Sequence, residues 1–177
     1  AAENLAEARR FVRGLTSPLD SGTLESRLAA LCADAARRAA AAGGHLACGF
    51  RVDGPPVPLH AAYEATLLRA AQSLLANVAS HAGATQAVLT LGYSPDSVSL
   101  DVFDDGAGFE PRSLPSAPRG DGTGFGLLSL RERVSDLHGE LSVESAPGEG
   151  TVVALRLPLE PAGADPDANS GLGGGQA

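Results

Sequence analysis

The chain has 177 residues, a formal net charge of −8 and 44% hydrophobic residues, a balance that suits one globular domain with its own core. All 13 basic side chains are arginine, which excludes the lysine that a P-loop, a eukaryotic-type protein kinase or Schiff-base chemistry needs. Net acidity and 4% aromatic residues also argue against a nucleic-acid surface, which needs basic patches and stacking side chains.

The chain begins at Ala1 and contains no methionine, so we expect it to be a piece of a longer protein. No apolar run approaches the ~20 residues that cross a bilayer, and no charged-then-apolar signal segment opens the chain. We therefore expect a cytoplasmic piece without membrane contact of its own, although the full-length protein could carry a membrane anchor. Cys32 and Cys48 lack metal or redox-pair spacing and are interpreted as small buried hydrophobes.

Residues 1–15 have apolar positions at a 3-4-3 spacing, the seam of a helix that packs lengthwise on another helix. Pro18 ends the segment, because proline disfavours helical geometry in the residue before it. We expect residues 1–15 to be the end of a longer helical hairpin and residues 16–159 to be the folded domain. The apolar positions are Leu5, Ala8, Val12 and Leu15.

Within the domain, a helix is expected from about Thr23 to Ala42, ending at Gly43-Gly44, and a strand over residues 46–52. A longer helix is expected over residues 60–82, after a proline-rich connection. Its apolar stripe consists of Leu67, Ala71, Leu74 and Val78.

Two hairpins and one more helix complete the expected fold. Strands are expected over 87–93 and 98–103, a helix over 127–137, and strands over 141–144 and 152–157. This order predicts an α+β fold: a two-layer sandwich of a mixed, mainly antiparallel sheet with helices on one face. From residue 160 onward, glycine, proline and aspartate predominate, so residues 160–177 are predicted to be a disordered tail.

Three glycine motifs carry the candidate chemistry. Each alone is more often an ordinary turn, but three in order indicate a binding site. Glycines let the backbone approach a ligand closely, and a helix N-terminus favours anionic phosphate. The motifs are Asp104-Asp105-Gly106-Ala107-Gly108 after a strand, Gly122-Thr123-Gly124-Phe125-Gly126 before a helix that Gly126-Leu127 opens, and Gly148-Glu149-Gly150-Thr151 in the last hairpin.

Two further side chains fit a nucleotide. Asp104, at the end of a strand, can accept a hydrogen bond from an exocyclic amine, so with the glycines it suits adenine plus phosphates. Ser73, Asn77 and His81 are spaced four residues apart and are expected to lie along one stripe, beside the apolar stripe. On its own, Asn77 would be an ordinary half-buried helix residue. Beside the glycine motifs, its carbonyl oxygen suits a magnesium ion that also holds phosphate.

Four segments of the chain together resemble the nucleotide-binding boxes of bacterial sensor histidine kinases, in the ATPase superfamily shared with gyrase, the large heat-shock chaperone and mismatch-repair proteins. They are QSLLANVASHAGA, VFDDGAGFEP, GTGFGLLSLRERV and SAPGEGTVVALRLP, and the resemblance covers about residues 17–159. The short segment between Phe109 and Gly122, the LRERV run and the opening ENLAEARRFVRGL resemble the kinases that pair with LuxR-type response regulators. In that subfamily the opening segment is the end of the second dimerisation helix.

The resemblance implies that ATP binds between the two layers and that its γ-phosphoryl group passes to a histidine on the dimerisation helices, for relay to a response regulator. It implies ATP, ADP and Mg²⁺ as ligands, the dimerisation and phosphoacceptor helices of the same protein as partners, and a homodimer. By position, it assigns the adenine amine to Asp104, supported by Thr151, and the magnesium to Asn77. The other implied nucleotide-site residues are Gly106, Gly108, Gly122, Thr123, Gly124, Phe125, Gly126, Leu127 and His81.

The sequence departs from the family pattern at three points. No histidine lies in a sequence like the family's acceptor box, so the acceptor is expected upstream of Ala1. Ser73 replaces a glutamate whose acid–base role typically contributes about 10²–10⁴-fold. Ser80 replaces a lysine or arginine, which removes a cation from the phosphate end. Two interpretations stay open: a working but slow kinase, and a degenerate one that binds ATP weakly or only regulates a partner.

An anti-sigma factor is an alternative from another class, since it shares the ATP-site architecture and phosphorylates a serine on its antagonist. The helical segment over residues 1–15 argues against this alternative, because anti-sigma factors of this fold do not resemble that opening. A gyrase-like ATPase coupled to DNA is disfavoured by the chain's acidity and size.

Overall fold

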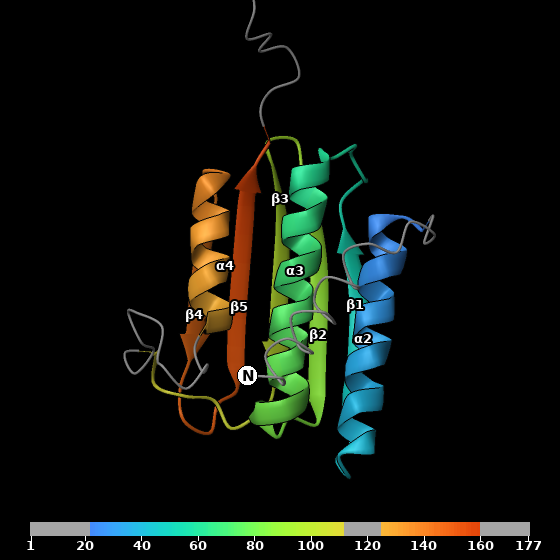
Figure 1. The fold of residues 1–177 in the computed structure, drawn as a ribbon, viewed down its shortest axis with the longest axis vertical. Helices are drawn as coiled ribbons and strands as arrows, with labels where there is room; N and C mark the ends of the chain where they lie inside the picture. The colour runs from blue at the N-terminus through green and yellow to red at the C-terminus, as the bar shows by residue number, and fades with distance from the viewer. Residues whose placement is uncertain (1–21, 112–124, 160–177) are drawn as a thin grey trace, which may run out of the picture.

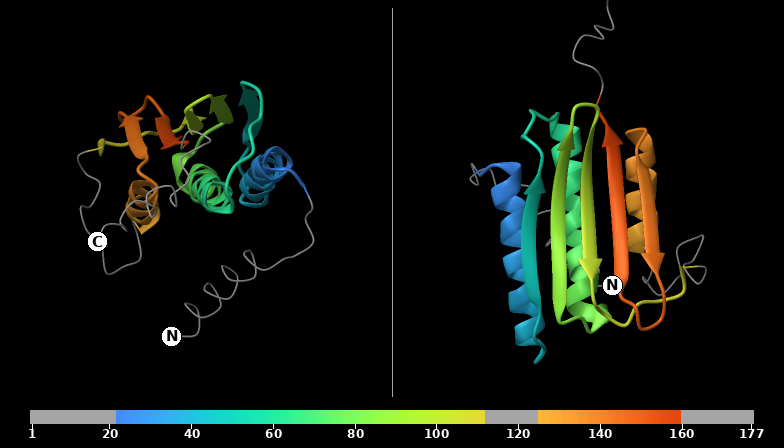
Figure 2. Two further views of the ribbon diagram at one scale, coloured as in Figure 1. Left: turned by 90° about the horizontal axis from the view of Figure 1, so that it is seen from above. Right: turned by 180° about the vertical axis from the view of Figure 1, so that it is seen from behind.

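The structure is a computed structural model that describes residues 22–111 and 125–159. In this part of the chain, a five-stranded sheet forms one layer and helices cover one of its faces (Figures 1 and 2). The strand order is β1-β2-β3-β5-β4, with β1 parallel to β2 and the other neighbours antiparallel. The predicted α+β sandwich with a mixed, mainly antiparallel sheet is confirmed.

Each element expected within the described residues is present with bounds within two residues of the prediction, except the end of the helix expected over 60–82. A βαβ crossover through that helix makes β1 parallel to β2. The two hairpins supply the antiparallel pairs β2–β3 and β4–β5, and the antiparallel pair β3–β5 joins the hairpins. The elements are α2 (Leu24–Ala41), β1 (Ala47–Asp53), α3 (Ala61–Asn77), η1 (Val78–Ala82), β2 (Gln86–Ser94), β3 (Ser97–Asp104), α4 (Phe125–Asp136), β4 (Glu140–Ser145) and β5 (Thr151–Pro158).

The first helix, α2, has a cap at each end. The hydroxyl of Thr23 accepts the backbone N–H of Ser26 at 3.3 Å, which satisfies one of the free amides of the first turn. At the other end, Gly43 has φ +84°, the left-handed conformation that ends a helix at little cost in glycine. Both ends are thus set by local sequence.

The core lies between the sheet and the helices. On β2, β3 and β5, alternate side chains point toward the helices and are buried, as the period of two in a strand requires. These inward residues are Ala87, Leu89, Leu91 and Tyr93 on β2, Val98, Leu100, Val102 and Asp104 on β3, and Val153, Leu155 and Leu157 on β5.

The helix α3 packs on the centre of this sheet. Its predicted apolar stripe is buried throughout. The members of the stripe are Leu67, Ala71, Leu74 and Val78, and Ala70 is buried beside them.

The expected α-helix over 60–82 is wrong in its last turn. The α-helix ends at Asn77, and the five residues Val78–Ala82 form a π-helical turn closed by Gly83 at φ +58°. His81 lies in this π-turn, and its side chain is not described, so the stripe expected for Ser73, Asn77 and His81 stays a prediction.

The cysteines behave as predicted: Cys32 is buried in the core, and Cys48 is half-buried against it. Within the described residues, no helix is both long and apolar enough to cross a membrane. The expected dimerisation helix over 1–15 and the expected tail over 160–177 lie outside the described residues.

Candidate functional site

At one end of the sheet, the inward-facing side chains change from apolar to polar. In the last row, Asp104 on β3 pairs with Thr151 on β5, which pairs with Ser145 on β4. In the next row, the corresponding inward positions are occupied by valines. The alternation that builds the core thus aims three polar side chains at the space between the sheet and the helices.

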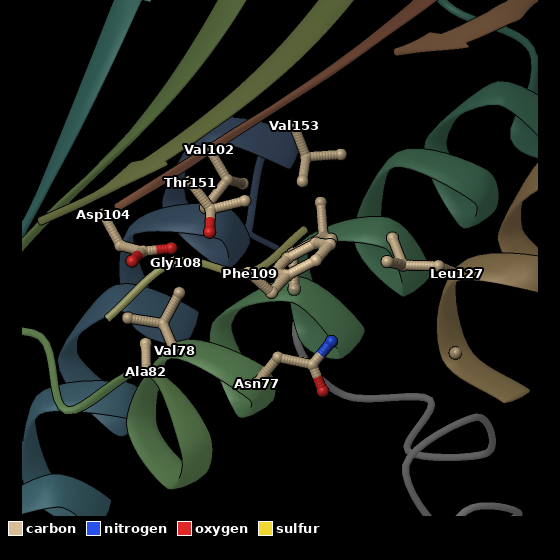
Figure 3. Close-up of a pocket in the computed structure, with 12 residues that line it drawn as sticks. Asn77, Val78, Ala82, Val102, Asp104, Gly108, Phe109, Leu127, Thr151 and Val153 are labelled. Atoms are coloured by element: carbon tan, nitrogen blue, oxygen red, sulfur yellow. The ribbon is translucent and has the colours of Figure 1, made fainter. Parts of the chain in front are cut away.

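A pocket of about 350 Å³ opens at this polar row (Figure 3). Its walls come from both layers of the sandwich: α3 and η1, the ends of β3 and β5, and the first turn of α4. A mainly apolar wall with a few polar groups is typical of small-molecule sites. The lining residues are Leu74, Asn77, Val78, Ala82, Val102, Asp104, Gly108, Phe109, Gly126, Leu127, Thr151 and Val153.

Asp104 is a buried carboxylate at the sheet end of the pocket, with 5% of its surface exposed. Its Oδ1 accepts the backbone N–H of Gly106 at 2.9 Å. Burial raises the pKa of Asp104, against the opposing effect of that hydrogen bond. A carboxylate that water reaches poorly gains from a donor on a ligand, so Asp104 suits the amine of a bound base.

Ser145 organises the neighbouring hydroxyl. Its O–H donates to the carbonyl oxygen of Gly150 at 2.8 Å, and its oxygen accepts the backbone N–H of Phe109 at 2.9 Å. The hydroxyl oxygens of Ser145 and Thr151 lie 3.1 Å apart. The single hydroxyl hydrogen of Ser145 is used in the bond to Gly150, so Thr151 is the donor in this pair. The Thr151 oxygen can therefore still accept a hydrogen bond beside Asp104. This end of the pocket favours a ligand that donates hydrogen bonds.

Two glycines are required by close packing around Asp104. A Cβ at Gly108 would overlap the carbonyl oxygen of Ala146, and a Cβ at Gly150 would overlap that of Asp104. Both glycines also have positive φ, +61° and +76°, which other residues rarely adopt. The first and third glycine motifs therefore shape one end of the pocket by letting two turns touch.

The opposite side of the pocket is more open. Asn77 is exposed at the end of α3, and Figure 3 shows it on the helix side of the pocket, away from Asp104. Gly126 and Leu127 lie in the first turn of α4, where backbone N–H groups have no partner within the helix. An amide oxygen and free N–H groups at this edge are a suitable arrangement for a phosphate chain and a cation.

Ser73 contacts α4 rather than the pocket. A Cβ at Gly126 would lie 2.8 Å from its hydroxyl oxygen, so α3 and α4 approach closely here because both residues are small. Ser73 is not part of the pocket lining. The same is true of Gly106, which is buried against Ala82 behind the lining.

The structure brings six of the sequence-predicted site residues into one pocket. They are Asn77, Asp104, Gly108, Gly126, Leu127 and Thr151. Phe125 begins α4 and His81 lies in η1, but their side chains are not described. Gly122, Thr123 and Gly124 lie outside the described residues.

Sequence reasoning missed several residues of the site. Phe109 follows the first glycine motif and places its ring in the pocket, a role that its position in Gly-x-Gly-Phe could have suggested. Ser145 gave no signal, because its importance comes from pairing with β5. The apolar wall includes Val78 and Val153, which the sequence marks only as core positions.

Known proteins resemble this chain in sequence and in fold. The model of the histidine kinase-, DNA gyrase B- and HSP90-like ATPase family matches residues 62–161, more than half of the chain. The Bacillus subtilis sensor histidine kinase LnrJ is 31% identical over 159 residues, which are 90% of this chain and 36% of LnrJ. The histidine-protein kinase/phosphatase DegS of the same organism is 32% identical over 55% of this chain and 24% of its own length. The chain thus spans about a third or less of these relatives.

Solved structures share the fold. The catalytic domain of the histidine kinase ThkA superposes with a TM-score of 0.60 at 17% identity, covering 78% of this chain and 91% of that domain. ShkA, solved at full length in complex with AMPPNP, gives a TM-score of 0.63 at 22% identity, covering 77% of this chain and 30% of ShkA. At these identities the likeness concerns the fold.

Proposed function

Because this chain belongs to the histidine kinase-, DNA gyrase B- and HSP90-like ATPase family, we propose that it is the ATP-binding catalytic domain of a bacterial sensor histidine kinase. The observation that carries the proposal is the buried Asp104 carboxylate at the end of a pocket between the two layers. Its relatives LnrJ and DegS are named histidine kinases, which favours a kinase over the anti-sigma factor that the sequence left as an alternative.

In this proposal, adenine occupies the sheet end of the pocket. Its exocyclic amine donates to Asp104, with the Thr151 oxygen beside it as a second acceptor. The apolar wall, which includes Val102 and Val153, would cover the faces of the base, and the Phe109 ring also lies in the pocket. Guanine would present a carbonyl oxygen to the same acceptors, which disfavours it.

The phosphates would lie toward Asn77 and the first turn of α4. The described residues hold no cluster of three His, Cys, Asp or Glu side chains that could bind a metal ion. A magnesium ion here would have Asn77 as its protein ligand and phosphate oxygens and water as the rest, a donor set that Mg²⁺ accepts. When bound, magnesium neutralises charge on the transferred phosphoryl group. Gly122, Thr123 and Gly124 would add backbone donors.

The reaction would transfer the γ-phosphoryl group to a histidine imidazole on dimerisation helices, of which residues 1–15 are the proposed end. The bond from the γ-phosphorus to the β,γ-bridging oxygen breaks, a bond to the imidazole nitrogen forms, and ADP leaves. We propose that the full protein is a homodimer that acts in the cytoplasm and passes the phosphoryl group to a LuxR-type response regulator.

Ser73 and Ser80 bear on the rate of this reaction. Since Ser73 packs against Gly126 and lies outside the pocket lining, it offers no acid–base group to the substrate. Positioning by the backbone and Asn77 is then the main source of rate, which favours a slow but working kinase.

The test of this proposal uses the longer protein that includes the upstream helices. Incubation with γ-labelled ATP and magnesium should give acid-labile phosphohistidine, and Asn77→Ala should reduce its rate by at least tenfold. Arg51→Ala, an exposed change on β1 outside the four nucleotide-binding boxes, serves as the control and should leave the rate unchanged. Phosphoserine on an added antagonist protein, with no phosphohistidine, would favour the anti-sigma alternative instead.

A further inference from the structure

The Asp105 carboxylate joins two segments of the site. We call residues 104–109 the glycine loop. Oδ1 of Asp105 accepts the backbone N–H groups of Thr85 and Gln86, each at 2.8 Å, and Oδ2 accepts the Thr85 hydroxyl at 2.7 Å. These bonds, the Gln86 amide first, lower the pKa of Asp105. The carboxylate is therefore ionised at neutral pH, and its hydrogen bonds are charge-assisted.

Backbone hydrogen bonds extend the same junction. The N–H of Asp105 donates to the carbonyl oxygen of Gln86 at 3.2 Å, and the N–H of Ala107 donates to that of Ala82 at 2.7 Å. Ala82 ends η1 and lines the pocket. The glycine loop is thus fastened to the segment that follows the helix carrying Asn77.

The junction fixes the direction of the preceding side chain. Asp104 is the last residue of β3 and points toward the helices, whereas Asp105 is exposed and bonds to the start of β2. Asp104 and Asp105 are adjacent in the backbone, so a displacement of the backbone at Asp105 would also displace Asp104, although Asp104 itself pairs with Ala87 and Thr151. The side chain of Asp105 accepts the hydrogen bonds from Thr85 and Gln86 that hold the glycine loop to the start of β2.

We propose that Asp105 is a positioning residue for base recognition, whose carboxylate holds that of Asp104 in the orientation that receives the exocyclic amine of adenine. The inference rests on the proposed ATP site. Asp105 lies outside the pocket lining, so it acts through Asp104 and does not touch the nucleotide. Asp105 consequently contributes to discrimination between adenine and other bases, as well as to the affinity for ATP.

The experiment measures the binding of ATP and of inosine triphosphate, which carries a carbonyl oxygen in place of the amine. Asp105→Ala should weaken ATP binding about tenfold, equivalent to about 1.4 kcal/mol, and change inosine triphosphate binding little. Asp105→Asn keeps an oxygen for the two amides and should stay within about threefold of the wild type. The two amide bonds remain without the help of the charge, and the side-chain amide donates to the Thr85 hydroxyl oxygen. Asp53→Ala, at the exposed end of β1, is the control.

Thr85→Val keeps the proposal testable if Asp105→Ala fails to fold, because it removes one hydroxyl and should lower the preference for ATP by a smaller factor. An equal loss of both nucleotides in Asp105→Ala, or an unchanged preference, would overturn the positioning role while leaving the ATP site intact. If the wild type binds neither nucleotide, the proposed function itself fails and the inference falls with it.

Discussion

Ser145 shows how one hydroxyl can hold a site together. It accepts from the Phe109 N–H, donates to the Gly150 carbonyl and accepts from the Thr151 hydroxyl, so its removal would take a partner from two part-buried backbone groups. Ser145→Ala should lower the free energy of unfolding by about 1–3 kcal/mol, the usual cost of unpaired buried polar groups. Urea unfolding checks this, with the exposed Ser142→Ala of the same strand as the control. Equal stability of the two variants would contradict the role given to Ser145.

Tyr93 and Glu25 form a side-chain hydrogen bond between the sheet and a helix. The buried Tyr93 hydroxyl donates to Glu25 Oε1 at 2.6 Å and joins β2 to the first turn of α2. The hydrogen bond from Tyr93 lowers the pKa of Glu25 below its ordinary value of 4.5. Burial raises the pKa of Tyr93 above its ordinary value of 10.0, and the hydrogen bond to Glu25 raises it further. The hydrogen bond therefore contributes fully to the free energy of unfolding between about pH 5 and pH 9, where Glu25 is ionised and Tyr93 is protonated.

Tyr93→Phe should lower the free energy of unfolding by about 1 kcal/mol at pH 7. Because the folded-state pKa of Glu25 is lowered, this contribution is lost as pH falls through that lowered value, so the difference from the wild type should shrink in acid. Tyr63→Phe is the comparison, since the Tyr63 hydroxyl donates to the carbonyl oxygen of Pro158 at 2.9 Å, a group that does not titrate. An acid dependence that is identical in both variants would contradict this account.

At the scale of elements, the site depends on two turns that touch. In Gly150→Ala, the new Cβ would overlap the carbonyl oxygen of Asp104, and the residue would keep a left-handed φ. Gly148 has a similar φ of +84°, but no atom lies within 4 Å of the position that a Cβ would take. Gly148→Ala should therefore cost about 1 kcal/mol of stability, and Gly150→Ala clearly more, since it adds steric overlap to the backbone strain. Thermal unfolding and ATP binding distinguish them: only Gly150→Ala should also weaken ATP binding. Equal losses in both variants would show that φ alone matters.

The elements were largely predictable from sequence, and the exceptions have a physical cause. Periodicity and capping residues located α2, and the Ser94–Ser97 turn located the first hairpin. The π-turn at the end of α3 was not predictable, because apolar spacing does not distinguish α from π geometry over one turn. Asp104, Asn77 and Thr151 carried chemical signals in their motifs. Ser145 and Asp105 did not, because their roles arise from strand pairing and from contacts 36 and 20 residues away.

At the scale of the whole molecule, the two layers have different tasks. The sheet ends in a row of polar acceptors, and the helices supply the amide of Asn77. Both layers contribute to the apolar wall of the pocket, which lies where they meet. The chain has no lysine, and this architecture explains how a nucleotide site can do without one: backbone amides, a carboxylate and an asparagine supply the polar contacts.

The most direct test of this account is calorimetric titration of the chain with ATP in the presence of magnesium. The account predicts that ATP binds and that Asp104→Asn weakens the affinity at least tenfold, because the buried acceptor of the adenine amine becomes a group that also donates. Asp101→Asn, on the same strand, should bind as the wild type does, since Asp101 lies outside the pocket lining. Failure of the wild-type chain to bind ATP at millimolar concentration, or equal affinity in Asp104→Asn, would contradict it.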